Sequence, residues 1–305
     1  MQLKSSINHI SGDNLRELLP LKWIYWLLIN IFNNNLRPKK PDFNKYKFIE
    51  KFKISSTDLK NIEKKEFSSP SRVLCNLFWE KINWENVKNE IGELNILDTG
   101  CGDGTYSLKL NRYAKGINSY RGIDLIKNKK WSKLTQEHSF IDFKNQTYLN
   151  VCKSAKSKTN IFISQSAIEH FQYDLQYFQE IKKFINASKN NTIQIHLFPS
   201  PACLWLYLFH GFRQYNLNSI LKILKIYKNE NCYFKIYPLG GTNCNLQHFK
   251  SISIPHFILR DFIKLNKKNY FKNLKKNILK DNELLPLNPS FYALIIHSNF
   301  KNKIF

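Results

Sequence analysis

The sequence predicts an α/β fold: a doubly wound, mostly parallel sheet of seven strands with helices on both faces. Short apolar runs that read as buried strands alternate with segments whose apolar residues recur at helical spacing. The first run, Asn95–Leu97, leads into a glycine-rich turn at residues 98–104, and residues 105–114 behind it have helical character. A glycine-rich turn between a strand and a helix N-terminus is typical of nucleotide-sized binding sites.

Each further strand is predicted from a short apolar run bounded by polar or turn-forming residues. These strands are residues 119–124, 138–143, 160–165, 191–199, 232–242 and 291–297. Apolar residues at three- and four-residue spacing predict helices between them. These helices are residues 70–82, 105–114, 177–187, 218–227 and 249–285. Ser68-Ser-Pro70 marks the first helix start, because serine is a favoured cap and proline a favoured first-turn residue.

The chain is expected to divide near residue 66. Residues 1–66 are predicted to form an N-terminal helical extension, and residues 67–305 the α/β domain. A lid and helical insertions are expected in that domain at about 200–230 and 246–285. In the extension, Leu21–Phe32 is short, aromatic and predicted to be helical. It either packs on the main domain or lies at a membrane interface with its tryptophans at the lipid headgroups.

The composition is that of a globular protein with a strong positive charge. Lys and Arg number 47 against 23 Asp and Glu, which gives a net charge of +24. Such a charge attracts nucleic acid, anionic lipid or an acidic glycan. A compositional origin stays open, because lysine, asparagine, isoleucine, phenylalanine and tyrosine are all abundant and the lysines are spread along the chain.

The cysteines and the apolar stretches bear on the compartment. The six cysteines form no C-x-x-C pair and no zinc-like spacing with histidine, so we expect a reduced, cytoplasmic protein. No stretch reaches the roughly 18 apolar residues of a membrane span. The closest, residues 18–32, is interrupted by Pro20, Lys22 and Asn30. Peripheral contact with the inner face of an anionic membrane remains compatible with this pattern.

The spacing of the glycine turn selects the ligand. Gly100, Gly102 and Gly104 follow the pattern G-x-G-x-G, and Asp98 and Asp103 add two carboxylates. Carboxylates repel a pyrophosphate and suit a ligand with a positive end and a ribose. The run Leu97-Asp-Thr-Gly-Cys-Gly-Asp-Gly104 resembles motif I of the class I S-adenosylmethionine-dependent methyltransferases. That resemblance implies a Rossmann-like methyltransferase fold whose last strand pair is antiparallel.

The resemblance also implies which residues bind S-adenosylmethionine. Asp124 ends the second strand about 20 residues past the glycines, where a ribose-binding carboxylate belongs. In the family, an acid after the third strand accepts a bond from the adenine amino group and an apolar neighbour covers the ring. The cofactor-binding residues implied are Asp98, Gly100, Cys101, Gly102, Gly104, Asp124, Leu125, Asp142, Phe143 and Gln165.

Candidates for a catalytic base follow the fourth and fifth strands. The pair Glu169-His170 matches a Glu-His pair that is frequent in the family, and His196 ends the fifth strand. Histidine suits proton transfer near neutral pH. His210 is a further candidate. Metal-dependent relatives carry an acid three residues before the Glu of this pair, where this chain has Ser166, so we expect no metal ion.

These features predict methyl transfer from S-adenosylmethionine, to a hydroxyl of a small molecule, a glycan or a lipid-linked saccharide. The aromatic segment Leu204–Tyr215 and the helix Leu21–Phe32 motivate that acceptor, because sugars and lipid headgroups favour aromatic contacts. Two alternatives stay open. An RNA methyltransferase would explain the charge. An inactive, cofactor-binding partner subunit would explain why Ser164 and Gln165 stand where the family carries an acid.

Overall fold

The computed structural model describes most of the chain. The described residues are 4–7, 11, 20–36, 47–60, 62, 67–207, 211–228, 231–255, 267–283 and 288–305. The strands are β1 Asn95–Thr99, β2 Ser119–Asp124, β3 Ile141–Asn145, β4 Ile161–Gln165, β5 Thr192–Pro199, β6 Cys232–Leu239 and β7 Phe291–Ser298. The longer helices are α1 Pro20–Ile31, α2 Pro70–Lys81, α3 Trp84–Ile91, α4 Tyr106–Tyr113, α5 Lys130–Glu137, α7 Asp174–Ser188, α9 Leu217–Ile226 and α12 Lys267–Asp281. The shorter helical segments are η2 Phe32–Leu36, η4 Tyr148–Asn150, α6 Val151–Ser154, η5 Ile168–His170, α8 Cys203–Leu206, α10 Thr242–His248 and η6 Phe249–Ser253.

The described strands form one sheet of seven in the order β3-β2-β1-β4-β5-β7-β6. Strands β1 to β5 pair in parallel, and β7 is antiparallel to both β5 and β6. The fold class predicted from the sequence, a mostly parallel seven-stranded sheet, is confirmed. The order reverses at β1, since β2 and β3 lie on one side of it and β4 on the other. Ligands of open α/β sheets bind at such a switch point, outside the carboxyl ends of the strands.

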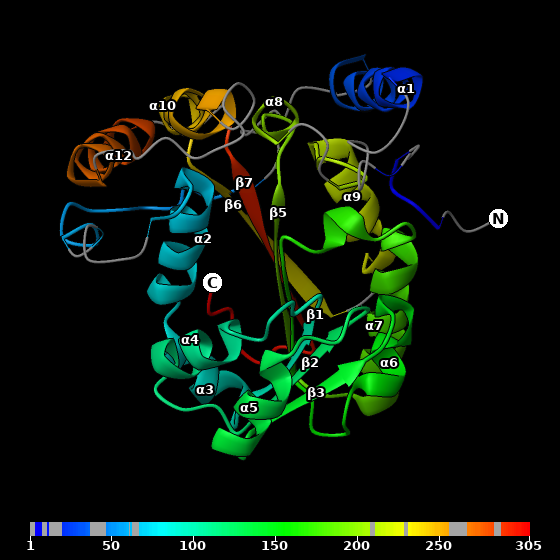
Figure 1. Ribbon diagram of the computed structural model, residues 1–305. Coiled ribbons are helices and arrows are strands. Elements are labelled where there is room, and N and C mark those ends of the chain that lie inside the picture. The colour runs from blue at the N-terminus through cyan, green and yellow to red at the C-terminus, as the bar shows by residue number, and fades with distance from the viewer. Residues whose placement is uncertain are drawn as a thin grey trace.

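Helices cover both faces of this sheet (Figure 1). Helix α2 buries Leu74 and Leu77 against one face, in a core that also includes Val87 of α3 and Leu110 of α4. Helices α7 and α9 cover the other face through residues such as Phe178 and Ile220. With both faces covered, the central strands are buried along their whole length, so β1, β5 and β7 are buried at every position.

Local signals explain why α2 starts where it does. Ser69 has extended backbone angles and its hydroxyl accepts the Arg72 N–H at 3.3 Å, while Pro70 occupies the first turn. Serine satisfies an otherwise unpaired N–H, and proline needs no partner there. This cap matters for function, because α2 delivers Ser69, Ser71 and Arg72 to the site described below.

The third strand begins later than the sequence predicts. It runs Ile141–Asn145 rather than 138–143, because Tyr120 of β2 pairs its N–H with Phe140 O and its Cα registers with Ile141. The shift moves Asp142 to the second position of the strand and puts Asn145 at its carboxyl end. The position of an acid relative to the strand end therefore differs from the sequence prediction.

Residues before 67 pack on the α/β domain. Ile49 forms a parallel bridge with Ile236 of β6, and Leu59 and Ile62 join the core that α2 covers. The described residues 51–60 form an extended stretch and a turn rather than the partly helical segment expected there. The division near residue 66 stays a prediction.

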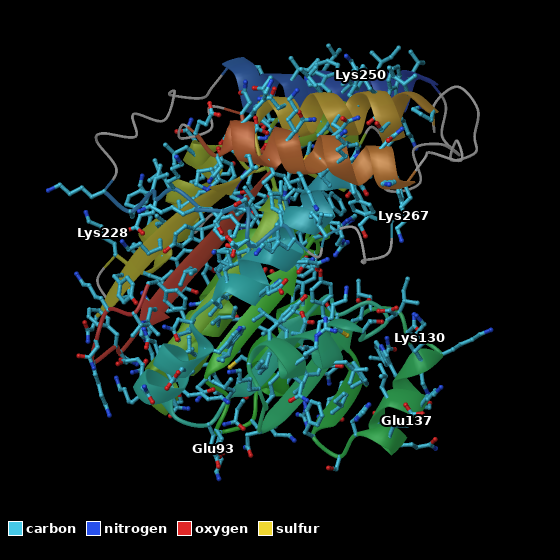
Figure 2. All side chains as sticks on the ribbon, turned by 90° about the vertical axis from the view of Figure 1, so that its left-hand side faces the viewer. Glu93, Lys130, Glu137, Lys228, Lys250 and Lys267 are labelled. Atoms are coloured by element: carbon cyan, nitrogen blue, oxygen red, sulfur yellow. The ribbon has the colours of Figure 1, made fainter. Side chains whose placement is uncertain are left out.

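Helices α12, α10, α8 and α1 follow one another in this order across one end of the molecule in Figure 1, and Figure 2 shows the same end from the side. Helix α1 was predicted from Leu21–Phe32 and is helical from Pro20 to Ile31. None of the helices in the described ranges combines the length and the apolar character that crossing a bilayer requires.

Candidate active site

A hollow of about 590 Å³ opens at the carboxyl ends of β1 and β4. It falls within the range of roughly 300–1,000 Å³ that small-molecule and cofactor sites occupy. The glycine turn forms one side of it, through Asp98, Gly100, Cys101, Gly102 and Asp103. The opposite side is formed by Arg72, Trp79, Tyr106, Ile163, Gln165 and Ser166, and Thr105, Lys109 and Lys130 complete it. Five of the predicted cofactor-binding residues, Asp98, Gly100, Cys101, Gly102 and Gln165, therefore line one hollow.

Asp98 is a buried carboxyl group at the floor of this hollow. Its side chain is 4% exposed, and the Tyr120 hydroxyl donates a hydrogen bond to Oδ2 at 2.5 Å. Burial, with a smaller contribution from the neighbouring charge of Asp124, raises the pKa of Asp98 to about 7 in spite of the lowering effect of the Tyr120 hydrogen bond. A ligand that brings a positive charge would favour the ionised form.

The three glycines of the turn have different roles. All have φ between +56° and +78°, a region that side chains with a Cβ rarely adopt. A Cβ on Gly100 would lie 2.4 Å from Ala167 Cβ, and one on Gly104 would lie 2.4 Å from the Phe143 ring. A Cβ on Gly102 would meet nothing within 4 Å, because this glycine borders the hollow itself. Gly100 and Gly104 are thus required by packing, and Gly102 leaves space for a ligand.

Asp124 holds the turn in place. Its Oδ2 accepts the Gly102 N–H at 2.9 Å and its Oδ1 accepts the Ile126 N–H at 3.1 Å. An ionised carboxylate has about four acceptor positions, so both oxygens can still accept ribose hydroxyls. Beyond it, Leu125 and Ile126 are 64% and 78% exposed, an apolar pair beside a polar turn. Asp98, Gly102 and Asp124 therefore come together, as the sequence predicts.

The far side of the hollow is fixed by a hydrogen-bonded cluster that the sequence did not reveal. The Trp79 indole N–H donates to Gln165 Oε1 at 2.6 Å, and Gln165 Nε2 donates to the Tyr106 hydroxyl. Tyr106 in turn donates to Asn76 Oδ1 at 2.6 Å. These residues come from α2, β4 and α4, so no local pattern connects them. Gln165 is a positioned amide, in the place where the family carries an acid.

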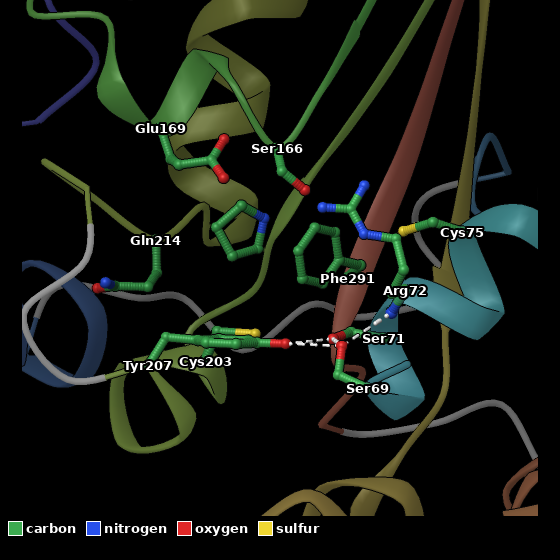
Figure 3. Close-up of a pocket in the computed structure, with 11 residues that line it drawn as sticks. Ser69, Ser71, Arg72, Cys75, Ser166, Glu169, Cys203, Tyr207, Gln214 and Phe291 are labelled. Atoms are coloured by element: carbon green, nitrogen blue, oxygen red, sulfur yellow. Dashed lines mark hydrogen bonds between the residues drawn. The ribbon is translucent and has the colours of Figure 1, made fainter. Parts of the chain in front are cut away.

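A smaller hollow of about 170 Å³ lies beside the first. Its lining is mostly polar or titratable and consists of Ser69, Ser71, Arg72, Cys75, Ser166, Glu169, Pro199, Cys203, Tyr207, Gln214 and Phe291. The Tyr207 hydroxyl lies 2.6 Å from that of Ser71 and 3.2 Å from that of Ser69 (Figure 3). Burial raises the pKa of Cys75 to about 12 and that of Cys203 well above its ordinary value. Both thiols are protonated at neutral pH, so neither is a ready nucleophile.

The two hollows meet at Arg72 and Ser166, which line both. Ser166 has φ +50°, a left-handed conformation that costs a residue with a Cβ free energy and that clusters at functional sites. Its N–H donates to Leu197 O at 2.9 Å, which ties the strained residue to β5. The Arg72 guanidinium donates to the Tyr106 hydroxyl at 3.4 Å. No sequence pattern singles out Arg72, since an arginine on a helix carries no signal of its own.

The predicted base candidates occupy three different environments. The Glu169 side chain is 1% exposed and lines the smaller hollow. His170 is half-buried at the end of η5 and lines neither hollow. His210 lies outside the described residues. Among the candidates that the structure describes, Glu169 is the one placed where an acceptor could reach it.

His196 is in the protein core and not at the site, so its assignment as a base is wrong. It is fully buried, its Nδ1 lies 2.8 Å from Ser164 Oγ, and the rings of Tyr177 and Phe178 pack edge-on against it. Burial lowers its pKa to about 3. The histidine is neutral at physiological pH and lines neither hollow.

Asp142 and Phe143 do not line the hollow, and neither do Asp124 and Leu125, so the predicted contacts of these four residues with the cofactor stay a prediction. Asp142 forms an ion pair with Arg121, whose Nε lies 2.8 Å from Oδ2. Phe143 stacks on Trp131 at a centroid distance of 5.1 Å and fills the space below Gly104. Phe143 therefore supports the turn from behind, and Asp142 holds Arg121.

The described ranges contain no group of three or more His, Cys, Asp or Glu side chains that could hold a metal ion. The expectation of a metal-free site stays a prediction.

The sheet and the turn together decide the fold. The sheet has five parallel strands and an antiparallel strand, β7, inserted before the edge. The glycine turn lies between two acids, Asp98 and Asp124, at the ends of neighbouring strands. This is the arrangement that the motif implied. The chain has the class I methyltransferase fold.

Comparison with known proteins gives likeness in structure only. No protein-family model matches the chain, and no curated protein matches it in sequence. A solved structure of the plantazolicin methyltransferase BamL, in complex with a triazolic desmethylPZN analog and SAH, is 15% identical. The likeness covers 80% of this chain and 90% of that one, with a TM-score of 0.46.

Two further solved structures illustrate the range. A SAM-dependent methyltransferase from Archaeoglobus fulgidus is 15% identical over 76% of this chain and 95% of its own, with a TM-score of 0.44. Phosphoethanolamine N-methyltransferase 2 of Haemonchus contortus is 13% identical over 80% of this chain and 60% of its own, with a TM-score of 0.42. The strand order, and not these likenesses, identifies the methyltransferase fold.

Proposed function

We propose that this chain transfers a methyl group from S-adenosylmethionine to an acceptor held in the smaller hollow. One observation carries the proposal: a cofactor-sized hollow on the glycine turn and a smaller hollow that contains several hydroxyl groups share Arg72 and Ser166 as lining residues. Adjacent sites allow two reactants to be held together, which is the main catalytic contribution in a group transfer of this kind.

The residues around the larger hollow fit S-adenosylmethionine. The buried Asp98 carboxyl would pair with the amino group of the methionine part, and Gly102 offers space without a Cβ. Asp124 would accept hydrogen bonds from the ribose hydroxyls. The exposed Leu125 would lie against the adenine ring. The cofactor, when bound, supplies an activated methyl group on a positively charged sulfur.

The residues around the smaller hollow favour a small acceptor with hydroxyl groups. A water molecule takes up about 30 Å³ in the liquid, so a hollow of 170 Å³ has room for roughly six waters. Such a space suits a single sugar-sized group. The hydroxyls of Ser69, Ser71 and Tyr207 and the amide of Gln214 can donate and accept hydrogen bonds. A hydroxyl of a small molecule, a glycan or a lipid-linked saccharide is therefore the acceptor that we favour.

Glu169 is proposed to take up the proton that the acceptor hydroxyl releases. A hydroxyl is a weak nucleophile at neutral pH, and a positioned base removes its proton as the new bond forms. The carboxylate lies in the same hollow as the acceptor and away from bulk water. Arg72, at the junction, would orient the acceptor oxygen and stabilise negative charge on it.

Calorimetry with S-adenosylhomocysteine tests the cofactor assignment. We expect micromolar binding to the wild type, about −8 kcal/mol, and at least a tenfold loss in Asp124→Ala. Asp142→Ala is the control, because it removes a carboxylate one strand away that pairs with Arg121, whereas Asp124 accepts the Gly102 N–H of the glycine turn. Equal affinity of wild type and Asp124→Ala would remove the ribose assignment, and no binding to the wild type would remove the function.

RNA methylation is the second candidate, favoured by the net charge of +24. Phosphate contacts make nucleic-acid binding fall steeply with salt. Affinity for bulk tRNA measured at rising salt, followed by methyl transfer to the bound RNA, tests it. Binding of S-adenosylhomocysteine without transfer to any hydroxyl or RNA acceptor would instead favour an inactive partner subunit.

A further inference from the structure

Four helical segments form one continuous layer over the carboxyl end of β5. Trp26 of α1 packs on Leu204 of α8, and Ser253 of η6 donates to Leu206 O at 2.9 Å. Gln247 of α10 donates to Tyr270 O of α12 at 3.0 Å. Figures 1 and 2 show these helices together at one end of the molecule. We name α1, α8, α10–η6 and α12 the helical cap.

Helix α1 turns an apolar stripe away from the protein. The outward side chains recur at three- and four-residue spacing, which puts them on one helical face. They are Leu21, Ile24, Tyr25, Leu28 and Phe32, exposed by 77%, 44%, 54%, 58% and 38%. The inward face is held by Trp26 and Asn30, both fully buried. A helix that only packs on its own domain keeps its apolar face inside, so this outward stripe points to something else that covers it.

The other segments of the cap also carry exposed apolar side chains. Trp205 of α8 is 50% exposed, Leu246 of α10 is 51% exposed, and Phe249 and Ile254 are 42% and 37% exposed. Of the twelve large hydrophobic side chains exposed in the described part of the chain, nine belong to the cap and its adjoining residues. Exposed apolar side chains gathered on one surface mark a docking site, whereas isolated ones need no explanation.

Lysines accompany these apolar residues. Lys22 on α1 and Lys250 on η6 are exposed, and Figure 2 shows Lys250 at the outer edge of the cap. On α12, exposed lysines recur every four residues, at Lys268, Lys272, Lys276 and Lys280. The acid of α12, Asp281, is directed inward and accepts N–H groups of Asn243 and Cys244. The cap therefore combines apolar and basic side chains on one end.

We propose that the helical cap docks on the surface of an anionic lipid bilayer. Aliphatic and aromatic side chains with Trp and Tyr among them, accompanied by lysines, match the boundary between acyl chains and headgroups. Anionic lipid attracts each nearby lysine by about 1 kcal/mol. A second copy of this chain is disfavoured as the occupant, because each copy carries +24 and the copies repel. A nucleic acid would leave the aliphatic stripe in water.

Docking in this way would place the smaller hollow, here named the acceptor hollow, close to the membrane. The single turn of α8 carries Trp205 outward, and Cys203 and the following Tyr207 line the smaller hollow. This consequence rests on the proposed function: the acceptor would be a lipid-borne hydroxyl presented at the bilayer surface. Docking itself depends only on the exposed side chains of the cap.

Vesicle sedimentation with the full chain and no methyl donor tests docking separately from catalysis. We compare vesicles of phosphatidylcholine with vesicles that also contain phosphatidylglycerol, at about 0.15 M ionic strength. The wild type should sediment with the anionic vesicles. The triple variant Leu21→Ser, Ile24→Ser, Leu28→Ser should bind about tenfold less or weaker still, and because Trp26 and Asn30 are kept, its thermal unfolding should match the wild type.

Lysine variants separate the contribution of the cap from net charge. One triple variant carries Lys268→Gln, Lys272→Gln and Lys276→Gln on α12. Its vesicle binding should be weaker than that of the wild type by about tenfold or more. The control is the triple variant Lys153→Gln, Lys156→Gln, Lys158→Gln. It removes the same charge from residues just before β4, at the opposite end of the strands, and should leave vesicle binding near that of the wild type. Three results would overturn the proposal: a wild type that ignores anionic vesicles, equal losses in both lysine variants, or a dimer that the Leu21/Ile24/Leu28 variant converts to a monomer. Retained vesicle binding by a chain inactive in methyl transfer would overturn the proposed function and leave docking intact.

Discussion

The hydroxyl of Tyr120 donates to the carboxyl of Asp98 at 2.5 Å, and both side chains are buried beneath the glycine turn. The donor comes from β2 and the acceptor from β1, so the parallel pairing of these strands creates the contact. The bond favours the ionised carboxylate, but burial outweighs it and raises the pKa of Asp98 to about 7. The negative charge of Asp98 is costly without a ligand, but it can pair with the positive group of a ligand that binds there.

Asp98 predicts how stability depends on pH. Its pKa is raised in the folded state, so its stabilising contribution is complete below about pH 4 and is lost as pH rises through about 7. At pH 8, Asp98→Asn should therefore stabilise the ligand-free protein, by up to about 4 kcal/mol, while weakening S-adenosylhomocysteine binding about tenfold or more. Urea unfolding and calorimetry at pH 8 measure the two effects. A variant that is less stable than the wild type at pH 8 would contradict the assigned burial cost.

Gly102 predicts a loss of binding without a matching loss of stability. Gly102→Ala should cost about 1 kcal/mol for its positive φ, and its methyl group should also enter the hollow and reduce S-adenosylhomocysteine affinity about tenfold or more. Gly92→Ala is the control, because Gly92 also has a positive φ and open space around a Cβ but lies after α3, outside the hollow. Equal affinities of the two variants would show that Gly102 does not border the ligand.

Glu169 predicts a change in turnover at constant cofactor affinity. Glu169→Gln should lower the rate of methyl transfer roughly 100-fold or more, because the amide cannot take up a proton. Binding of S-adenosylhomocysteine should change little, since Glu169 lines the acceptor hollow and not the larger one. The control Glu85→Gln alters an acid in the first turn of α3 and should change neither quantity. An unaffected rate in Glu169→Gln would end the proposed role of this carboxylate.

The buried pair Arg213–Asp174 predicts a large stability effect. Arg213 Nη1 lies 3.0 Å from Asp174 Oδ2, and Asp174 also accepts hydrogen bonds from Tyr215 and Ser6. Asp174→Asn leaves a buried guanidinium without its counter-charge and should cost about 3–5 kcal/mol. Replacing both residues, by Asp174→Leu with Arg213→Met, should recover part of that loss. Urea unfolding checks both variants, and a single substitution within about 1 kcal/mol of wild type would mean that the pair is not formed.

The same pair has a functional side. Arg213 precedes Gln214, which is 2% exposed and lines the acceptor hollow. Loss of the ion pair should therefore lower turnover in the fraction that remains folded, with cofactor affinity retained. Turnover and cofactor affinity, measured together, distinguish a displaced Gln214 side chain from general unfolding.

Much of the fold follows from local patterns. The second strand is found at Ser119–Asp124 as predicted, and α2 starts at its Ser69 cap, because strand alternation and helix capping are encoded within a few residues. The third strand was placed three residues early. Its start depends on pairing with Tyr120 of β2, which an apolar run by itself does not specify.

The candidate site was predicted unevenly for the same reason. Asp98, the glycine turn and Asp124 are close in sequence and in space. His196 looked like a strand-end base, but α7 covers that face of β5 and encloses the ring between Tyr177 and Phe178. Depth below the surface depends on which helix packs on which face, and residue spacing along β5 carries no information about that.

The sequence by itself determined the α/β class, the order of its elements and the acid-flanked glycine turn, because these depend on interactions within a few turns or one strand. Only the tertiary structure decided that Arg72 and Ser166, far apart in the chain, form the wall between two hollows. It likewise decided that Trp26 of α1 packs on Leu204 of α8. The physical reason is common to both: these neighbours are brought together by strand pairing and helix packing between distant segments, which no local pattern of residues specifies.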